Sequence, residues 1–321
     1  MPSFWTHASF AEEARQMLSE LSKARMPMGP WSRAILAYPH AYWIGMQGPD
    51  LFLFYPPAAL GAKGLGTLLH TQRTPDFLCA LFTIADSMEE AEEKDRLCAL
   101  SYACGFLGHY LLDSRTHAFI YARAGVKRSL QSFCIHNALE ADLSRIIVER
   151  SLGLSPGNLP DPAAYRLSPA EQQTLSCLLA RAISCVYQLS VSPSSIRRAF
   201  RATHTSMGIL YDSTGRKGSF AHFLEAPFKH PYLSPLFLGE SAYYSDPANL
   251  AHRLWHDPYT GRSSHADFLE LYDHALDIYL PLLHRLELLP SPRKRRIVLE
   301  KLCRLDFHGE PIDKIKKRRA R

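Results

Sequence analysis

The sequence predicts an all-α fold, and three observations support this prediction. Apolar residues recur with helical periodicity along nearly the whole 321-residue chain. Runs that alternate between apolar and polar residues, which are typical of half-buried strands, are almost absent. Helix-start signals, in which a capping residue precedes proline, occur at Thr74-Pro75 and Ser168-Pro169. With 46% apolar and 21% charged residues, the chain can bury one large core or two modest ones.

The first half of the chain has the periodicity of six helices. The first is expected to begin at a cap on Thr6 or Ser9 and to end near Lys23. The other five are expected over residues 31–46, 58–70, 74–90, 94–112 and 127–152.

A proline-rich stretch from Ser155 is the best internal boundary, and Ser168 with Glu171 close behind is the cap signal that ends it. Beyond it we expect helices over 174–189, 194–211 and 264–288, with an aromatic and proline-rich loop over 220–259 and a Ser263-Ser264 cap on the closing helix. The predicted organisation is a metal-binding catalytic core over 1–154, a helical part packed on it over 155–291, and a basic tail over 292–321.

Composition excludes several classes of protein. No segment has the ~18 consecutive apolar residues of a membrane span. The first residues lack a basic stretch followed by an apolar run, so we expect no signal peptide and a cytoplasmic protein. The seven cysteines are odd in number and form no CxxC pair, which indicates buried thiols rather than a disulfide framework or a thiolate zinc site.

Basic residues concentrate at the end of the chain. Residues 292–321 hold 12 Lys or Arg against 4 Asp or Glu, a net charge of +8, whereas the whole chain carries only +6. Such a tail is suited to peripheral contact with an anionic membrane or with nucleic acid. A solvated tail with no binding role is about equally compatible with the composition.

The segment GFLGHYLLDSRTH, residues 105–117, spaces His109, Asp113 and His117 four residues apart, so a helix would place all three along one stripe. His136 and Glu140 repeat the spacing on the next predicted helix. A lone histidine in an apolar helix usually makes one hydrogen bond, but several such groups together bury charge that costs several kcal/mol per ion without compensation. A multinuclear metal site supplies that compensation, and the earlier His7 and His70 lie in similarly apolar surroundings as further ligands.

In the order of these motifs, the first ~150 residues resemble the zinc-dependent phospholipases C, the all-helical bacterial enzymes that include the phosphatidylcholine-preferring phospholipase C and the alpha-toxin catalytic domain. This family shares its metal site with the single-strand zinc nucleases. The resemblance implies two or three zinc ions and hydrolysis of a phosphodiester by metal-activated water.

Carried over residue by residue, the resemblance gives the first metal to His70, His109 and Asp113. It gives a third metal to His7 and the shared carboxylate of Asp113, completed by the amino-terminal residue, which would be Pro2 after removal of Met1.

The same resemblance gives the second metal to His117, His136 and Glu140. It matches Asp50, in QGPDLFLFY, to the carboxylate that orients or deprotonates the attacking water.

The sequence departs from the family pattern in three places. The first histidine is residue 7, whereas the secreted enzymes have about a dozen residues before it, so an amino-terminal ligand has a shorter segment with which to reach the metal. The Asp113–His117 spacing is shorter by two, which lets one helix continue through both residues. Leu51 and Thr67 replace aromatic residues that enclose choline, so choline selectivity is not expected.

We therefore expect a zinc-dependent phosphodiesterase of phospholipase C type that acts on a phospholipid or related phosphoester. Two alternatives stay open: single-strand nuclease or phosphomonoesterase activity at the same metals, and a non-catalytic helical binding protein stabilised by structural zinc. The retained Asp50 argues against the second alternative, because a structural site needs no base. The remaining histidines of the second half lack a repeated acid partner, and we expect surface or core roles for them.

Overall fold

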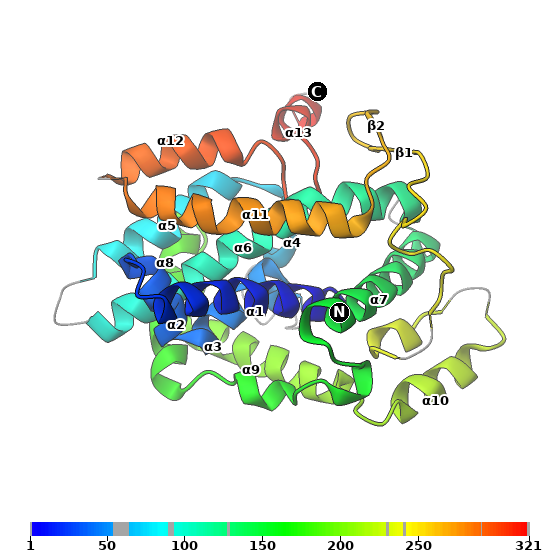
Figure 1. Ribbon diagram of the computed structural model, residues 1–321. Coiled ribbons are helices and arrows are strands. Elements are labelled where there is room, and N and C mark those ends of the chain that lie inside the picture. The colour runs from blue at the N-terminus through cyan, green and yellow to red at the C-terminus, as the bar shows by residue number, and fades with distance from the viewer. Residues whose placement is uncertain are drawn as a thin grey trace.

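The computed structural model describes residues 2–53, 64–88, 93–126, 129–228, 231–239, 242–289 and 291–319, and over them the prediction of an all-α fold is confirmed (Figure 1). The helices of the first half are α1 (Pro2–Lys23), α2 (Pro30–Ala37), α3 (Pro39–Gly45), α4 (Leu65–Thr71), α5 (Thr74–Asp86), α6 (Glu93–Ala124) and α7 (Leu130–Leu152). Those of the second half are α8 (Pro169–Tyr187), α9 (Pro193–Leu210), α10 (Arg216–Glu225), α11 (Phe268–Glu287), α12 (Pro292–Leu302) and α13 (Ile312–Arg319).

Short 3-10 turns and one small ribbon connect these helices. The turns are η1 (Gly48–Phe52), η4 (Pro156–Asn158), η5 (Pro162–Tyr165) and η6 (Ser234–Leu236). The ribbon pairs β1 (Trp255–His256) with β2 (Ser263–Ser264). Among the described residues, none of the helices has the length and hydropathy of a membrane span.

Three predicted helix caps are wrong, although the helix expected from residue 74 does begin there. Helix α1 begins at Pro2, and Thr6, expected as a cap, hydrogen-bonds Ser144 of α7 at 2.8 Å between the hydroxyl oxygens. Arg73, in the left-handed region, precedes α5, so Thr74 is not its cap. Ser263 and Ser264 form β2, and Asp267 caps α11 instead, in a capping box. The capping box at Ser168 and Glu171 is confirmed.

Proline divides the helix expected over 31–46 into α2 and α3. Pro39 lacks an N–H donor and pushes Tyr38 out of the helical region, to φ −126° and ψ 62°. Helix α10 falls partly in the expected loop over 220–259. Of the helix expected over 58–70, residues 58–63 lie outside the described residues, as do 127 and 128 of the helix expected over 127–152.

Helix α6 is the centre of the molecule. It continues through His117, as the Asp113–His117 spacing allows, and ends at Ala124, beyond the expected end at residue 112. Its residues from Cys98 to Ser114 are buried on every side. Helix α3 crosses it in backbone contact, because a Cβ on Gly105 would lie 2.2 Å from the carbonyl oxygen of Tyr42. Helices α1, α7 and α11 cover other faces of α6 (Figure 1).

The segment expected as a basic tail is folded onto this core. Leu299, Cys303 and Phe307 are buried in the same apolar cluster as the residues of α6. Helix α12 packs on α5, and Arg295 pairs with Asp86 there. The basic composition of 292–315 therefore coexists with an apolar face that attaches the segment to the protein.

Candidate metal centre

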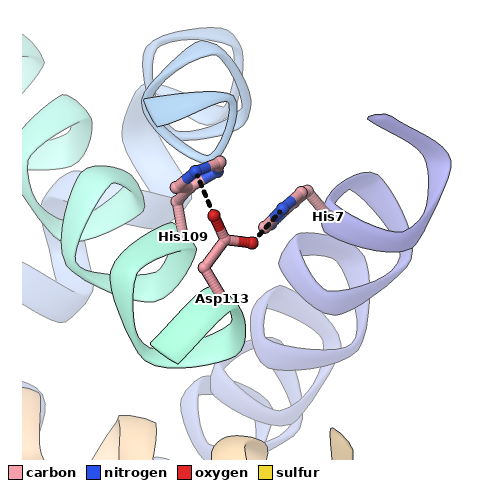
Figure 2. A group of neighbouring side chains, drawn as sticks. All are labelled: His7, His109 and Asp113. Carbon is pink, nitrogen blue, oxygen red and sulfur yellow. Dashed lines mark ion pairs between the residues drawn. The ribbon is translucent and has the colours of Figure 1, made fainter. Parts of the chain in front are cut away.

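Asp113 on α6 lies at the centre of three histidines. Its Oδ1 is 3.1 Å from Nε2 of His7 on α1 and 3.4 Å from Nδ1 of His117. Its Oδ2 is 3.1 Å from Nε2 of His109. The rings of His7 and His109 are stacked with centroids 4.0 Å apart, and Figure 2 shows both histidines pointing at the carboxylate from different helices. Asp113 is thus placed to be shared between two ions.

Asp50 and His70 border the same cluster. His70, at the end of α4, has its Nε2 3.1 Å from Oδ1 of Asp50 in η1. The donor atoms of Asp50, His70 and His109 all lie within 4.8 Å of one another. Gly48 allows this approach, because its φ is +51° and a Cβ there would lie 2.4 Å from Cδ2 of His109.

A further group joins α6 to α7. Glu140 has its Oε1 3.1 Å from Nε2 of His136 and 3.7 Å from Nε2 of His117. All three donor atoms lie within 4.8 Å of one another. This is the set that the resemblance gives to the second metal.

Backbone carbonyls orient three of the histidines. Nδ1 of His70 lies 2.7 Å from the carbonyl oxygen of Gly66, and Nδ1 of His109 lies 2.9 Å from that of Met46. Nδ1 of His117 lies 3.2 Å from the carbonyl oxygen of Asp113. A carbonyl accepts a hydrogen bond from the protonated nitrogen, so Nε2 of each ring keeps its lone pair for a metal.

The electrostatics favour ionised carboxylates. Burial raises the pKa of Asp113, but the charges of His117, His109 and His7 outweigh it and hold the pKa well below its usual range. Burial likewise raises the pKa of Glu140, but His136 and His117 outweigh this effect and hold the pKa well below its usual value. Without metal these carboxylates depend on protonated histidines for compensation, which dicationic zinc would replace.

The residues fit a zinc cluster. Histidine nitrogens and carboxylate oxygens are ordinary zinc ligands. Two buried nitrogens, Nδ1 of His7 and Nε2 of His109, have no hydrogen-bond partner among the described residues. The latter is 3.1 Å from Asp113 without the geometry of a hydrogen bond. Burying such an atom costs ~1–3 kcal/mol, and ligation of an ion at this position would offset the cost.

The structure brings together all the expected site residues whose side chains it describes: His7, Asp50, His70, His109, Asp113, His117, His136 and Glu140. The side chain of Pro2 lies outside the described residues, so its ligation stays a prediction.

Sequence reasoning missed two residues of the C-terminal segment that adjoin the cluster. The Phe307 ring lies 5.3 Å from that of His70 and 5.6 Å from that of His109, measured between centroids. The His308 ring is stacked on that of His70 at 5.7 Å. No spacing motif links either residue to the first half, because the contact depends on tertiary folding alone.

One further group of potential ligands lies on the surface. His252, Asp267 and Glu270 approach one another, but His252 and Glu270 are exposed. Asp267 and Glu270 already form the capping box of α11, which accounts for their proximity.

Comparison with known proteins gives one result. No curated protein and no solved structure matches the chain significantly. The family model described as zinc dependent phospholipase C matches residues 6–184, more than half of the chain and a range that contains the ligand candidates of the buried cluster from His7 to Glu140. This family match supports a zinc-dependent, phosphodiesterase-like hydrolase activity. The chain belongs to the zinc-dependent phospholipase C family.

Proposed function

We propose that this protein hydrolyses phospholipids as a phospholipase C, with two or three zinc ions held by the ligand groups of α1, α4, α6 and α7. The observation that carries the proposal is the shared position of Asp113 between His7 and His109, beside the separate group at Glu140. His70, His109 and Asp113 would hold one ion, and His117, His136 and Glu140 another. His7, with Asp113, would hold a third.

Asp50 is the proposed base. Bound zinc would polarise the phosphoester and lower the pKa of a coordinated water. Burial raises the pKa of Asp50, but His70 and His109 lower it below its usual value, so its carboxylate is ionised at neutral pH. An ionised carboxylate at the edge of the cluster can orient a water and accept its proton.

The surroundings of the cluster favour a lipid. A cavity of about 810 Å³ opens over Asp50, His70, His117 and Glu140. Four apolar side chains that line it are 46% to 64% exposed: Leu53, Val126, Leu130 and Phe133. Exposed apolar residues gathered at one mouth mark a surface that binds apolar partners, and acyl chains are such a partner whereas a nucleic-acid backbone is not.

Zinc-loaded protein should release phosphorylated head group from short-chain phosphatidylcholine or phosphatidylethanolamine. Asp50→Asn should lose at least 100-fold of this activity while retaining its zinc, because general-base catalysis contributes ~10²–10⁴-fold. The matched control is Asp277→Asn on the exposed side of α11, which should retain full activity. Cleavage of single-stranded DNA or of a phosphomonoester without cleavage of lipid would favour the alternative activities. Zinc at or below one ion per chain would contradict the multinuclear site.

We also propose a peripheral contact with anionic membrane through the basic residues at 314–321. Each basic residue near such a surface contributes ~1 kcal/mol. Sedimentation with vesicles that contain phosphatidylserine, but not with neutral vesicles, is the expected result.

A further inference from the structure

The C-terminal segment reaches the metal cavity on a tight turn. Leu305 and Pro311 form an isolated antiparallel bridge that closes it. Inside the turn, Oδ1 of Asp306 accepts hydrogen bonds from the backbone N–H groups of His308 at 2.9 Å and Glu310 at 2.8 Å. These bonds fix the backbone that carries His308.

The same turn is attached to the ligand groups. The backbone N–H of Phe307 donates to the carbonyl oxygen of His70 at 3.1 Å, and the Phe307 side chain is buried. The His308 ring is nearly parallel to that of His70, with an angle of 11° between their planes. Its Nδ1 lies 3.1 Å from the hydroxyl oxygen of Tyr121 on α6. Residue 308 is therefore held at a defined position beside the metal cavity, although it lies far outside the family match.

His308 borders two cavities. One is the 810 Å³ cavity over the ligand groups. The other has a volume of about 970 Å³ and shares Thr67, Tyr121, Val126 and His308 with the first. The two spaces therefore meet at the His308 and Tyr121 side chains.

The linings of the two cavities differ in character. The metal cavity has the exposed apolar mouth described above. The second cavity is lined mainly by hydrogen-bonding side chains, and Leu68, Val126, Pro258 and Ile315 complete its wall. The hydrogen-bonding side chains are Thr67, Thr71, Gln72, Tyr121, Tyr259, Asp306, His308 and Glu310. A metal cavity with an apolar mouth and an adjoining polar cavity match an amphipathic phosphoester, in which the phosphoryl group separates acyl chains from a head group.

We propose that the second cavity is a head-group subsite for small hydroxyl- or amine-bearing groups, and that His308 contacts the bound ester at its entrance. The proposal rests on the phospholipase function proposed above. The phosphoryl group would lie at the metals, and the head group would extend past His308 toward Tyr259 and the carboxylates. Hydroxyl and amine groups donate hydrogen bonds, which carboxylate, amide and hydroxyl oxygens accept.

Equilibrium binding tests the subsite independently of turnover. Calorimetric titration of the zinc-loaded, full-length protein would compare phosphoethanolamine and glycerol phosphate with methyl phosphate, which has no head group to place in the second cavity. We expect the two larger esters to bind at least about tenfold more tightly, equivalent to ~1.4 kcal/mol. Equal affinities for the three esters would overturn the proposal.

Variants separate the subsite from the metal cluster. His308→Ala should remove the preference for the larger esters and leave the affinity for methyl phosphate within about twofold. Tyr259→Leu, in the part of the second cavity that the metal cavity does not share, should reduce the preference in the same way. If His308→Ala loses zinc, the Tyr259→Leu variant alone tests the subsite. His222→Ala, at an exposed position of α10 that lines neither cavity, is the matched control and should retain the preference.

The outcomes distinguish this proposal from the proposed function. If the larger esters bind more tightly but no lipid is hydrolysed, the phospholipase function fails and the subsite stands. If lipids are hydrolysed but both cavity variants keep the wild-type preference, the subsite is refuted and the phospholipase function stands.

Discussion

Replacing Gly48 by Ala should weaken zinc binding, although Gly48 is not itself a ligand. A Cβ at this position would lie 2.4 Å from Cδ2 of His109, whereas carbon atoms in contact are separated by ~3.5 Å or more. The His109 ring must therefore move by about 1 Å. This shift exceeds the ~0.2 Å that metal–ligand distances tolerate, so zinc binding should weaken. The shift would also disturb the 2.9 Å contact from His109 Nδ1 to the carbonyl oxygen of Met46.

Two effects of this substitution can be separated with a matched variant. An alanine at φ +51° costs ~1–2 kcal/mol of folding free energy from backbone strain alone. Gly153 follows α7 with φ +63°, and a Cβ there would meet no atom within 4 Å. Gly153→Ala should therefore show the strain and keep its zinc. Gly48→Ala should show the same strain and a loss of zinc affinity of about 10–100-fold, the range for disturbed support of a metal ligand.

The measurement is competition for zinc against a chromophoric chelator, with thermal unfolding of the chelator-treated proteins recorded in parallel. Zinc affinities of the two variants within about twofold of each other would refute the placement of His109 as a ligand supported by Gly48. If both affinities were lowered to a similar extent, the loss would come from reduced stability and not from displacement of the ring.

Three further outcomes follow from the same geometry. Glu140→Gln should lower zinc content by about one ion per chain, as measured by elemental analysis, because it removes the only carboxylate of its ligand group; unchanged content would contradict the assignment of Glu140 as a ligand. Burial lowers the pKa of His117, but Asp113 and Glu140 raise it to about 9 in the metal-free protein. Protonated His117 stabilises the fold fully below pH 6.5, and this stabilisation is lost as the pH rises through 9. Over this pH range the thermal unfolding midpoint of chelator-treated protein should therefore fall by roughly 5 °C more than that of His117→Asn. An equal fall in both would show that other groups, such as buried thiols, are responsible. Phe133→Ser should raise the KM for micellar lipid several-fold and leave hydrolysis of a water-soluble phosphodiester unchanged, because this exposed ring lies at the cavity mouth and not among the ligands; equal effects on both substrates would argue against a role in lipid contact.

Much of the site was predictable because its ligands lie one helical turn apart. His109, Asp113 and His117 share a stripe of α6, and His136 and Glu140 share a stripe of α7, so helical geometry alone brings each set together. The relation of these sets to Asp50 required a resemblance, since Asp50 comes from a separate turn that only tertiary packing places beside His70. The helix starts were less predictable, because hydroxyl side chains such as that of Thr6 serve interhelical hydrogen bonds as well as caps.

The C-terminal segment shows what composition alone does not predict where periodicity is weak. Its charge predicted a tail that binds an anionic membrane or nucleic acid, and several of its basic side chains have partners within the protein. The Arg295 guanidinium lies 5.2 Å from the ring centroid of Trp31 in addition to its pairing with Asp86, and Arg296 is 2.7 Å from Asp76. A guanidinium over an aromatic ring and beside a carboxylate is satisfied without a membrane or a nucleic acid. Net charge counts side chains without regard to where they point. It therefore does not show that Leu299, Cys303 and Phe307 are buried in the core cluster and attach this segment to the protein. The same folding brings His308 to the cavity, so a segment outside the family match helps to shape a site whose ligand candidates from His7 to Glu140 lie within the match.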